Sequence, residues 1–147
     1  MTPAIFGSVL YGADETVCRL VASLIPSMAG TPFPADARAL GVVRRGQLCG
    51  GVVFTNYRGH LVEMSGAFTR ADWALPDTLR RLFAYPFLDL KVENLVTVTG
   101  RKNKRARRMN EGLGFKLVGV VDRGYDGKED AVMYQMPRET CRWLPKG

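Results

Sequence analysis

Apolar side chains recur at helical spacing in three segments of the chain. In residues 14–25, apolar positions follow Val17 at intervals of three, four, seven and eight residues, which predicts a helix with one buried face. Asp14 stands where a capping residue is expected, and Pro26 ends the pattern.

Two further helices are predicted at residues 76–85 and 103–113. Pro76 suits the first turn of the earlier helix, and Asn103 and Gly114 suit the cap and the stop of the later one. Each helix has a set of positions that share one inward face. These positions are Leu75, Leu79, Leu82 and Phe83 in the earlier helix and Ala106, Met109, Asn110 and Leu113 in the later one.

Between the helices the period changes to short runs rich in β-branched residues, which are typical of strands. Residues 39–69 contain three such runs, separated at "RGQ" and "NYRGH", and predict an antiparallel meander. Residues 26–37 are rich in proline, glycine and small side chains and predict a loop. Other strands are expected at residues 4–10, 94–100, 115–124 and 130–144. The order β-α-βββ-α-β-α-ββ predicts a single mixed α/β (α+β) domain over residues 1–147, with a mostly antiparallel central sheet flanked by helices.

The chain has 147 residues and a net charge of +7, and most of that charge comes from one segment. Residues 101–108, the basic run, hold six cationic side chains and no acid, so the rest of the chain contributes 7 − 6 = +1. With 46% hydrophobic and 24% charged residues, the composition is that of a soluble globular protein. The cations of the basic run are Arg101, Lys102, Lys104, Arg105, Arg107 and Arg108.

The three cysteines are far apart and follow no metal-ligand or disulfide pattern. We therefore expect no metal site, and a reducing, cytoplasmic setting. The N-terminal residues lack the basic stretch of a signal peptide, and no apolar run approaches membrane-spanning length. A membrane partner is not expected.

One motif gives this arrangement a family likeness. Residues 103–115 read N-x-x-A-x-x-x-x-x-x-L-G-F, at the predicted third helix and its end. Together with the order of elements over residues 40–145, this motif resembles the GNAT superfamily of N-acetyltransferases, and within it the branch of ribosomal-protein N-terminal acetyltransferases. The matching positions are Glu63, Trp73–Pro76, Tyr85–Phe87, Asn103, Ala106, Leu113–Phe115, Gly119 and Arg123.

The resemblance implies direct transfer of an acetyl group from acetyl-CoA to a primary amine, which belongs to a protein N-terminus, a lysine or a small molecule. A monomer or a homodimer is expected. In this family the fourth and fifth strands open like a V, and a main-chain amide of the fourth strand binds the thioester carbonyl. The glycine within residues 65–69 is compatible with a bulge there. The residues assigned to the cofactor are Ala67, Phe68, Arg70, Trp73, Ala74, Leu75, Asn103, Ala106, Arg107 and Asn110.

Two residues are candidates for proton transfer. Glu63 matches a family carboxylate that accepts the proton of the amine, directly or through water, because an alkylammonium with a pKa of about 10 must lose a proton before it attacks. The alternative for Glu63 is a cross-strand ion pair. Tyr134 is a back-up acid for the leaving thiolate, with core packing as its alternative. Asn103 is expected to cap its helix and to contact the pantetheine arm. Asn110 is expected either to contact the sulfur end of the cofactor or to be satisfied in the core.

The sequence departs from the family pattern at three positions. Ala74 and Pro76 replace the glycines of the diphosphate-binding turn, and proline has no N–H to donate. Asn110 replaces the tyrosine that many members use as an acid, and Val118 replaces a glutamate. These changes support an alternative function, in which a catalytically degenerate basic adaptor binds nucleic acid or a protein partner.

The basic run admits several roles. It is a solvated helix start, a cradle for the phosphates of coenzyme A, or a nucleic-acid surface. For the phosphates we expect Arg107 first and Lys104 second, and for nucleic acid the run lacks interleaved aromatic residues. A third interpretation of the whole chain is an enzyme that acts on a nucleobase or another large target. The acceptor is expected to be shaped by residues 26–36 and by the loop at 122–129.

Overall fold

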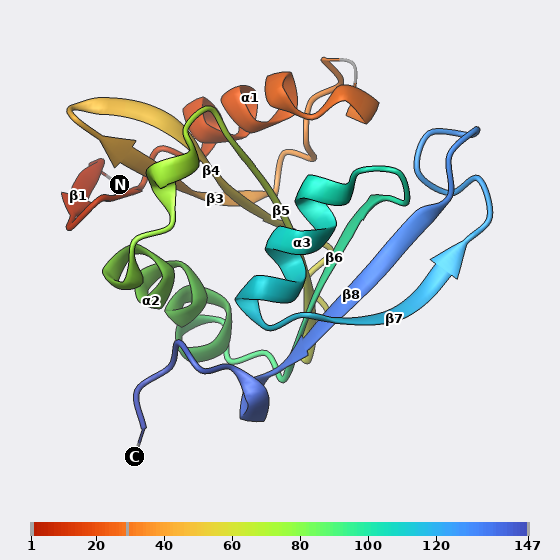
Figure 1. The fold of residues 1–147 in the computed structure, drawn as a ribbon. Helices are drawn as coiled ribbons and strands as arrows, with labels where there is room; N and C mark the ends of the chain where they lie inside the picture. Colours follow the sequence, from red (N-terminus) through yellow and green to blue (C-terminus); the bar gives the residue numbers. More distant parts are fainter. Residues whose placement is uncertain (1, 29, 147) are drawn as a thin grey trace.

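The computed structural model describes residues 2–28 and 30–146, and its strands form one eight-stranded sheet (Figure 1). The spatial order is β1-β2-β3-β4-β5-β6-β8-β7. In the described part of the chain, β5 and β6 are parallel and every other neighbouring pair is antiparallel. The strands are β1 (Ala4–Phe6), β2 (Val9–Tyr11), β3 (Arg38–Arg44), β4 (Gln47–Thr55), β5 (Leu61–Phe68), β6 (Asn94–Gly100), β7 (Lys116–Val121) and β8 (Ala131–Pro137).

The α-helices lie on both faces of the sheet. Helix α1 (Asp14–Leu24) buries Val17 and Val21 against one face, in a cluster with Val53 of β4. Helices α2 (Pro76–Ala84) and α3 (Lys104–Leu113) pack on the other face. Alternation along a strand produces this division, because Val53 and its neighbour Phe54 point to opposite sides of β4.

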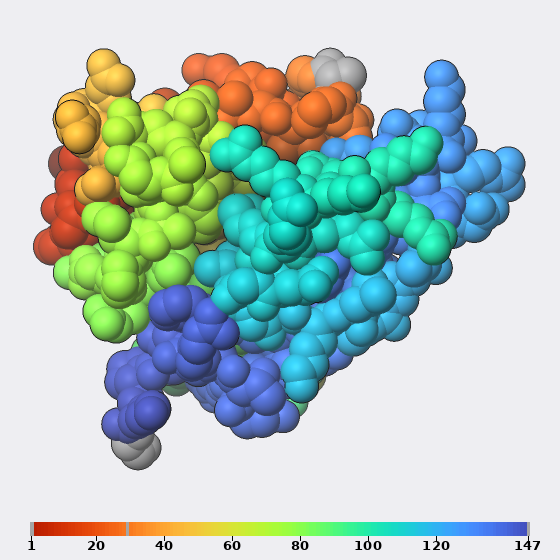
Figure 2. Space-filling view, viewed as in Figure 1, coloured from red at the N-terminus to blue at the C-terminus, as the bar shows by residue number. Residues whose placement is uncertain are grey.

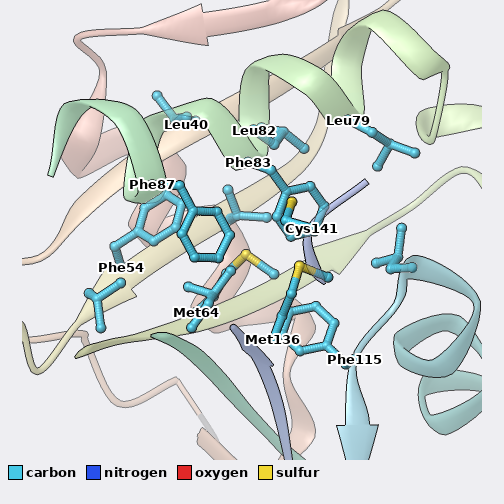
Figure 3. Packing of buried hydrophobic residues seen from close by; sticks show 14 of the residues in the cluster. Leu40, Phe54, Met64, Leu79, Leu82, Phe83, Phe87, Phe115, Met136 and Cys141 are labelled. Atoms are coloured by element: carbon cyan, nitrogen blue, oxygen red, sulfur yellow. The ribbon is translucent and has the colours of Figure 1, made fainter. Parts of the chain in front are cut away.

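The larger core lies under α2 and the C-terminal segment. Figure 3 shows Leu79, Leu82 and Phe83 of α2 pointing toward the sheet residues Met64 and Met136. Phe83 and Phe87 are 1% and 0% exposed, so both rings are removed from water. Burial of side chains of this size stabilises the fold by about 1.5–3 kcal/mol each. This core fixes the position of β5 relative to α2.

Strands β5 and β6 separate soon after they meet. Their parallel pairing covers Leu61–Glu63 against Asn94–Val96 and stops there. Beyond this point β5 continues to pair with β4 as far as Phe68, and β6 continues to pair with β8 as far as Gly100. The two strand edges that face each other past Glu63 therefore have no strand between them in the described structure. This is the V-shaped opening that the family resemblance implies.

The predicted fold class and order of elements are confirmed, with local corrections. The strand expected at residues 4–10 is a hairpin of β1 and β2, because Gly7 turns the chain at a φ of +60°. The last strand ends at Pro137, and a 3₁₀ turn over Arg138–Thr140 follows it. Residue 29, within the predicted loop, lies outside the described residues, as do residues 1 and 147.

Three finer expectations are also corrected. Asp14 is the first residue of α1 and makes no cap; its Oδ1 accepts a hydrogen bond from the Ala39 N–H at 2.9 Å and ties the helix to β3. Leu75 precedes α2 instead of lying within it, and it is 37% exposed. The β4–β5 register runs without a break from Gly50–Phe68 to Thr55–Glu63, so residues 65–69 hold no bulge. Register shifts lie instead between β3 and β4 and between β7 and β8.

The helices of the described ranges are all too short or too polar to cross a membrane.

Candidate active-site cleft

A cleft of about 680 Å³ opens where β5 and β6 separate. Its walls come from β4, β5 and the loop after it, β6, the length of α3, the segment that follows α1 and the loop between β7 and β8. Figure 2 shows the face on which α3, in teal, borders the orange segment after α1 and the green segment before α2. The cleft brings together eight of the twelve residues that the sequence assigned to the site. They are Glu63, Ala67, Phe68, Arg70, Trp73, Asn103, Ala106 and Asn110.

Glu63 lies at the point of the V. It pairs with Val96 as the last residue of the parallel ladder, and its side chain is half-buried. The Asn56 amide donates to Glu63 Oε2 at 3.0 Å, from a backbone position with a φ of +55°. Within the described residues Glu63 has no ion pair, so the cross-strand salt bridge considered as its alternative role does not form.

Ala67 and Phe68 line the cleft at the end of β5. One edge of the strand is held by β4, where Gly50 and Gly51 oppose them. A Cβ on Gly50 would lie 2.2 Å from the Ala67 carbonyl oxygen, so only glycine permits the strands to approach this closely. The main-chain groups of β5 that face the cleft are therefore fixed from behind.

The loop after β5 is held by stacking and by an ion pair. The rings of Phe68 and Trp73 are parallel, with centroids 3.7 Å apart. Arg70 donates two hydrogen bonds to the Asp72 carboxylate, at 2.7 and 2.8 Å, and Arg44 lies 3.6 Å from the same group. The hydrogen bonds from Arg70 lower the pKa of Asp72 to about 2. Arg70 is thus partly neutralised where it lines the cleft.

Ala74 and Leu75 are the two loop positions of the assigned set that do not line the cleft. Both are exposed in front of α2. The Leu75 N–H is already used, since it donates to the Trp73 carbonyl at 3.1 Å, and Pro76 has no N–H. This turn therefore presents fewer free amides than the glycine turn that it replaces.

Helix α3 forms the opposite wall. Asn103 caps the helix, as predicted, with its Oδ1 accepting from the Ala106 N–H at 3.1 Å. Asn110 is 7% exposed and lines the cleft. Gly114 ends the helix at a φ of +114°, also as predicted. Because its N-cap, its apolar spacing and its C-terminal glycine were all predicted, this helix is the most accurately predicted element of the site.

Arg107 and Tyr134 lie outside the cleft and contact each other. The Arg107 Nε donates to the Tyr134 hydroxyl at 3.0 Å, and that hydroxyl donates to Glu111 Oε2 at 3.0 Å. Tyr134 is fully buried on β8. Arg107 also donates to the Arg101 carbonyl, so its guanidinium is used within the protein. The bond to Tyr134 raises the pKa of Arg107, which keeps the cation charged. These contacts attach α3 to β8.

The basic run is divided among several environments. Arg101 pairs with Asp130 at 3.0 Å, and Arg107 is engaged as described above. The other four cations have no ion pair with any described residue. Among the six, all of which the structure describes, Arg105 is the one that lines the cleft. The wall of the cleft thus adds Arg105 as a candidate for the phosphates, and the expected roles of Arg107 and Lys104 there stay predictions.

Asn56, Arg105 and Tyr125 are among the cleft residues that the sequence did not assign to the site. Asn56 was hidden in a turn, although an asparagine in a short loop is a common carrier of positive φ. Arg105 was one of six cations, and Tyr125 lay in the expected loop without a named role. The two loops expected to shape the acceptor do reach the cleft, through residues 26–28, 33–34 and 124–125.

No group of three or more His, Cys, Asp or Glu side chains comes together as a metal site among the described residues.

No family model matches the chain, and no curated protein matches it significantly in sequence. Solved structures do match. One described as a probable acetyltransferase has a TM-score of 0.69 at 17% identity, over 94% of this chain and 98% of that one. A GNAT-family acetyltransferase from Bacillus anthracis has a TM-score of 0.63 at 16% identity, over 94% and 99%. Spermidine N-acetyltransferase from Vibrio cholerae, in complex with CoA and spermine, has a TM-score of 0.61 at 17% identity, over 72% and 68%. The chain has the fold of the GNAT acetyltransferases.

Proposed function

We propose that this protein is an acetyl-CoA-dependent N-acetyltransferase that moves an acetyl group directly to a primary amine. The observation that carries the proposal is the separation of β5 and β6 after three residue pairs, with Glu63 at the vertex. Past that point, strand edges with unused main-chain donors and acceptors face a cleft. Backbone groups of this kind need hydrogen-bonding partners. The pantetheine arm carries amide groups that fit such edges.

The cleft would contact the two ends of coenzyme A in different ways. At the thioester end, the Phe68 N–H on the free edge of β5 would face an oxyanion, because the main-chain groups of its neighbour Ala67 are directed at β4. At the diphosphate end, Arg70 and Arg105 are the cations of the cleft wall. The ligand would therefore be held by two arginines where the family pattern uses a glycine turn.

Glu63 is the proposed acceptor of the amine proton. Asn56 holds one carboxylate oxygen, and the other has no partner among the described residues. A neutral amine at this position attacks the thioester carbonyl, the carbon–sulfur bond breaks with its electron pair going to sulfur, and the second proton of the nitrogen passes to the leaving thiolate or to water. A thiol pKa of about 8.5 makes the thiolate a tolerable leaving group, so the absence of Tyr134 from the cleft is compatible with turnover. Holding the two reactants together supplies much of the remaining acceleration.

Isothermal titration with acetyl-CoA tests the proposal. We expect the protein to bind it, and Arg105→Ala to weaken binding about tenfold, because a charge-assisted contact contributes about 1.5–3 kcal/mol. Arg108→Ala, a cation of the same helix that does not line the cleft, is the matched control. Absence of heat from wild type at millimolar ligand would end the enzyme proposal.

The alternative remains a basic adaptor that has kept the fold without the activity. The observation that favours it is the diphosphate loop, in which Asp72 engages Arg70 and Pro76 lacks an N–H. An adaptor would bind RNA or DNA through the basic run, with affinity that falls steeply with salt. Single alanine substitutions would then weaken binding to similar extents, each reducing the salt slope by about one. The uneven response described for Arg105 and Arg108 separates the two functions.

We also propose that the acceptors include protein N-termini, as the ribosomal-protein branch implies.

A further inference from the structure

The cleft has few charges for its size. Among the described residues of its wall, Glu63 is the one acid, and Arg70 and Arg105 are the cations. The wall therefore carries 2 − 1 = +1. A polyamine has several positive charges and needs several acids to replace its hydration. A single carboxylate matches a single ammonium.

The acceptor side of the cleft is apolar. Ile25, Met28 and Phe33 come from the segment after α1, and each is half-buried. Ile25 and Phe33 pack against the same cluster as Ala67, which places this segment on the α1 face of the sheet. Glu63 lies two and four residues from Ser65 and Ala67 on β5, so alternation turns its side chain toward that face as well. A carboxylate and an apolar wall thus border one space.

We propose that the acceptor is a primary amine with a single positive charge and an apolar body next to the nitrogen. Arylalkylamines and peptides with an apolar first residue have this chemistry, and polyamines do not. The inference rests on the proposed acetyltransferase function and specifies its substrate class. The specificity would come from Phe33 and Met28 on one side and from the scarcity of acids on the other.

Acetyl transfer should be measured with three probes: 2-phenylethylamine, a peptide that begins Met-Leu, and spermidine. We expect kcat/KM for either apolar amine to exceed that for spermidine by about tenfold or more. Phe33→Ala should raise KM for the apolar amines with little change in kcat. The peptide and the small amine distinguish a protein acceptor from a free one.

A charge variant makes the test reciprocal. Met28→Glu adds a second acid to the wall and should raise the relative rate with spermidine, while Met28→Leu should not. Thermal shifts with each amine in the presence of CoA provide a binding readout without turnover. Preference for spermidine in wild type, or no binding and no turnover with either apolar amine, would overturn the inference. Failure to bind acetyl-CoA would instead contradict the proposed function itself.

Discussion

Glu63 and Asn56 lie at the junction of the two diverging strands, and their contact leaves one carboxylate oxygen for the amine. If Glu63 accepts the amine proton, Glu63→Gln should lower turnover at neutral pH by about 10²–10⁴-fold. Binding of acetyl-CoA should hardly change, since the substitution keeps the size of the side chain. Steady-state rates and titration on the same preparation check both parts. Unchanged turnover would leave Glu63 with a structural role.

For Tyr134 we expect an effect on stability and not on turnover. Its buried hydroxyl bridges Arg107 and Glu111, so Tyr134→Phe should lower the free energy of unfolding by about 1–3 kcal/mol. Turnover by the folded fraction should remain, because the residue does not line the cleft. Urea unfolding monitored by circular dichroism, together with rates at low temperature, would test this. A large loss of kcat without loss of stability would return Tyr134 to the list of catalytic acids.

Among the elements, α3 is one whose ends and buried face could be predicted from the sequence. Its cap, its apolar period and its C-terminal glycine each follow from local backbone chemistry. The side of the helix that faces the cleft could not be predicted. Arg107 and Glu111, four residues apart, share the flank that meets Tyr134, and Arg105 and Met109 share the flank that lines the cleft. Only the packing of α3 on the sheet decides between these two flanks.

Other elements depended on tertiary context in the same way. The sequence showed that the loop before α2 lacks the glycines of the family pattern. The Phe68–Trp73 stack and the Arg70–Asp72 pair became visible only in the structure. The hairpin at residues 4–10 was predicted as one strand, because the sequence does not show that Gly7 has a positive φ and turns the chain.

The contact between β4 and β5 leads to a stability prediction. Gly50→Ala would force the strands apart, since its Cβ meets the Ala67 carbonyl and the Phe68 Cα at 2.2 and 2.7 Å. We expect a loss of about 2 kcal/mol or more. Gly112→Ala, in α3 with no atom within 4 Å of the new Cβ, should instead be neutral or stabilising by up to about 1 kcal/mol. Thermal unfolding of both variants measures the difference. Equal melting temperatures would contradict a close approach of the strands at Gly50.

The loop after β5 should respond to acid. The pKa of Asp72 falls from 3.8 to about 2, mainly through the hydrogen bonds from Arg70. A carboxyl with a lowered folded-state pKa stabilises the protein above its unfolded pKa, and this contribution is lost as the pH falls from about 4 toward 2. Asp72→Asn should therefore flatten the stability profile in that window and leave its shape at neutral pH unchanged. Denaturant titrations at several pH values compare the two proteins.

For the whole molecule, ligand binding and folding are linked. If acetyl-CoA binds only the folded chain, a hundredfold excess over its dissociation constant should raise the free energy of unfolding by about 2.7 kcal/mol. The effect should be absent with acetate alone, which cannot reach both walls of the cleft. Differential scanning calorimetry with and without ligand measures the shift. An RNA oligonucleotide that stabilised the protein while acetyl-CoA did not would favour the adaptor.

The strand separation at Glu63 has a consequence for how far such a protein can change. Where a ligand is received by main-chain edges, as we propose for β5 and β6, side chains along those strands carry little of the recognition. They can be replaced, one after another, as long as the strands diverge at the same place and glycines such as Gly50 keep the backbones close. The neighbours at 16–18% identity share the fold although no family model matches this sequence. A binding surface formed by main-chain groups is therefore expected to persist while many side chains are substituted.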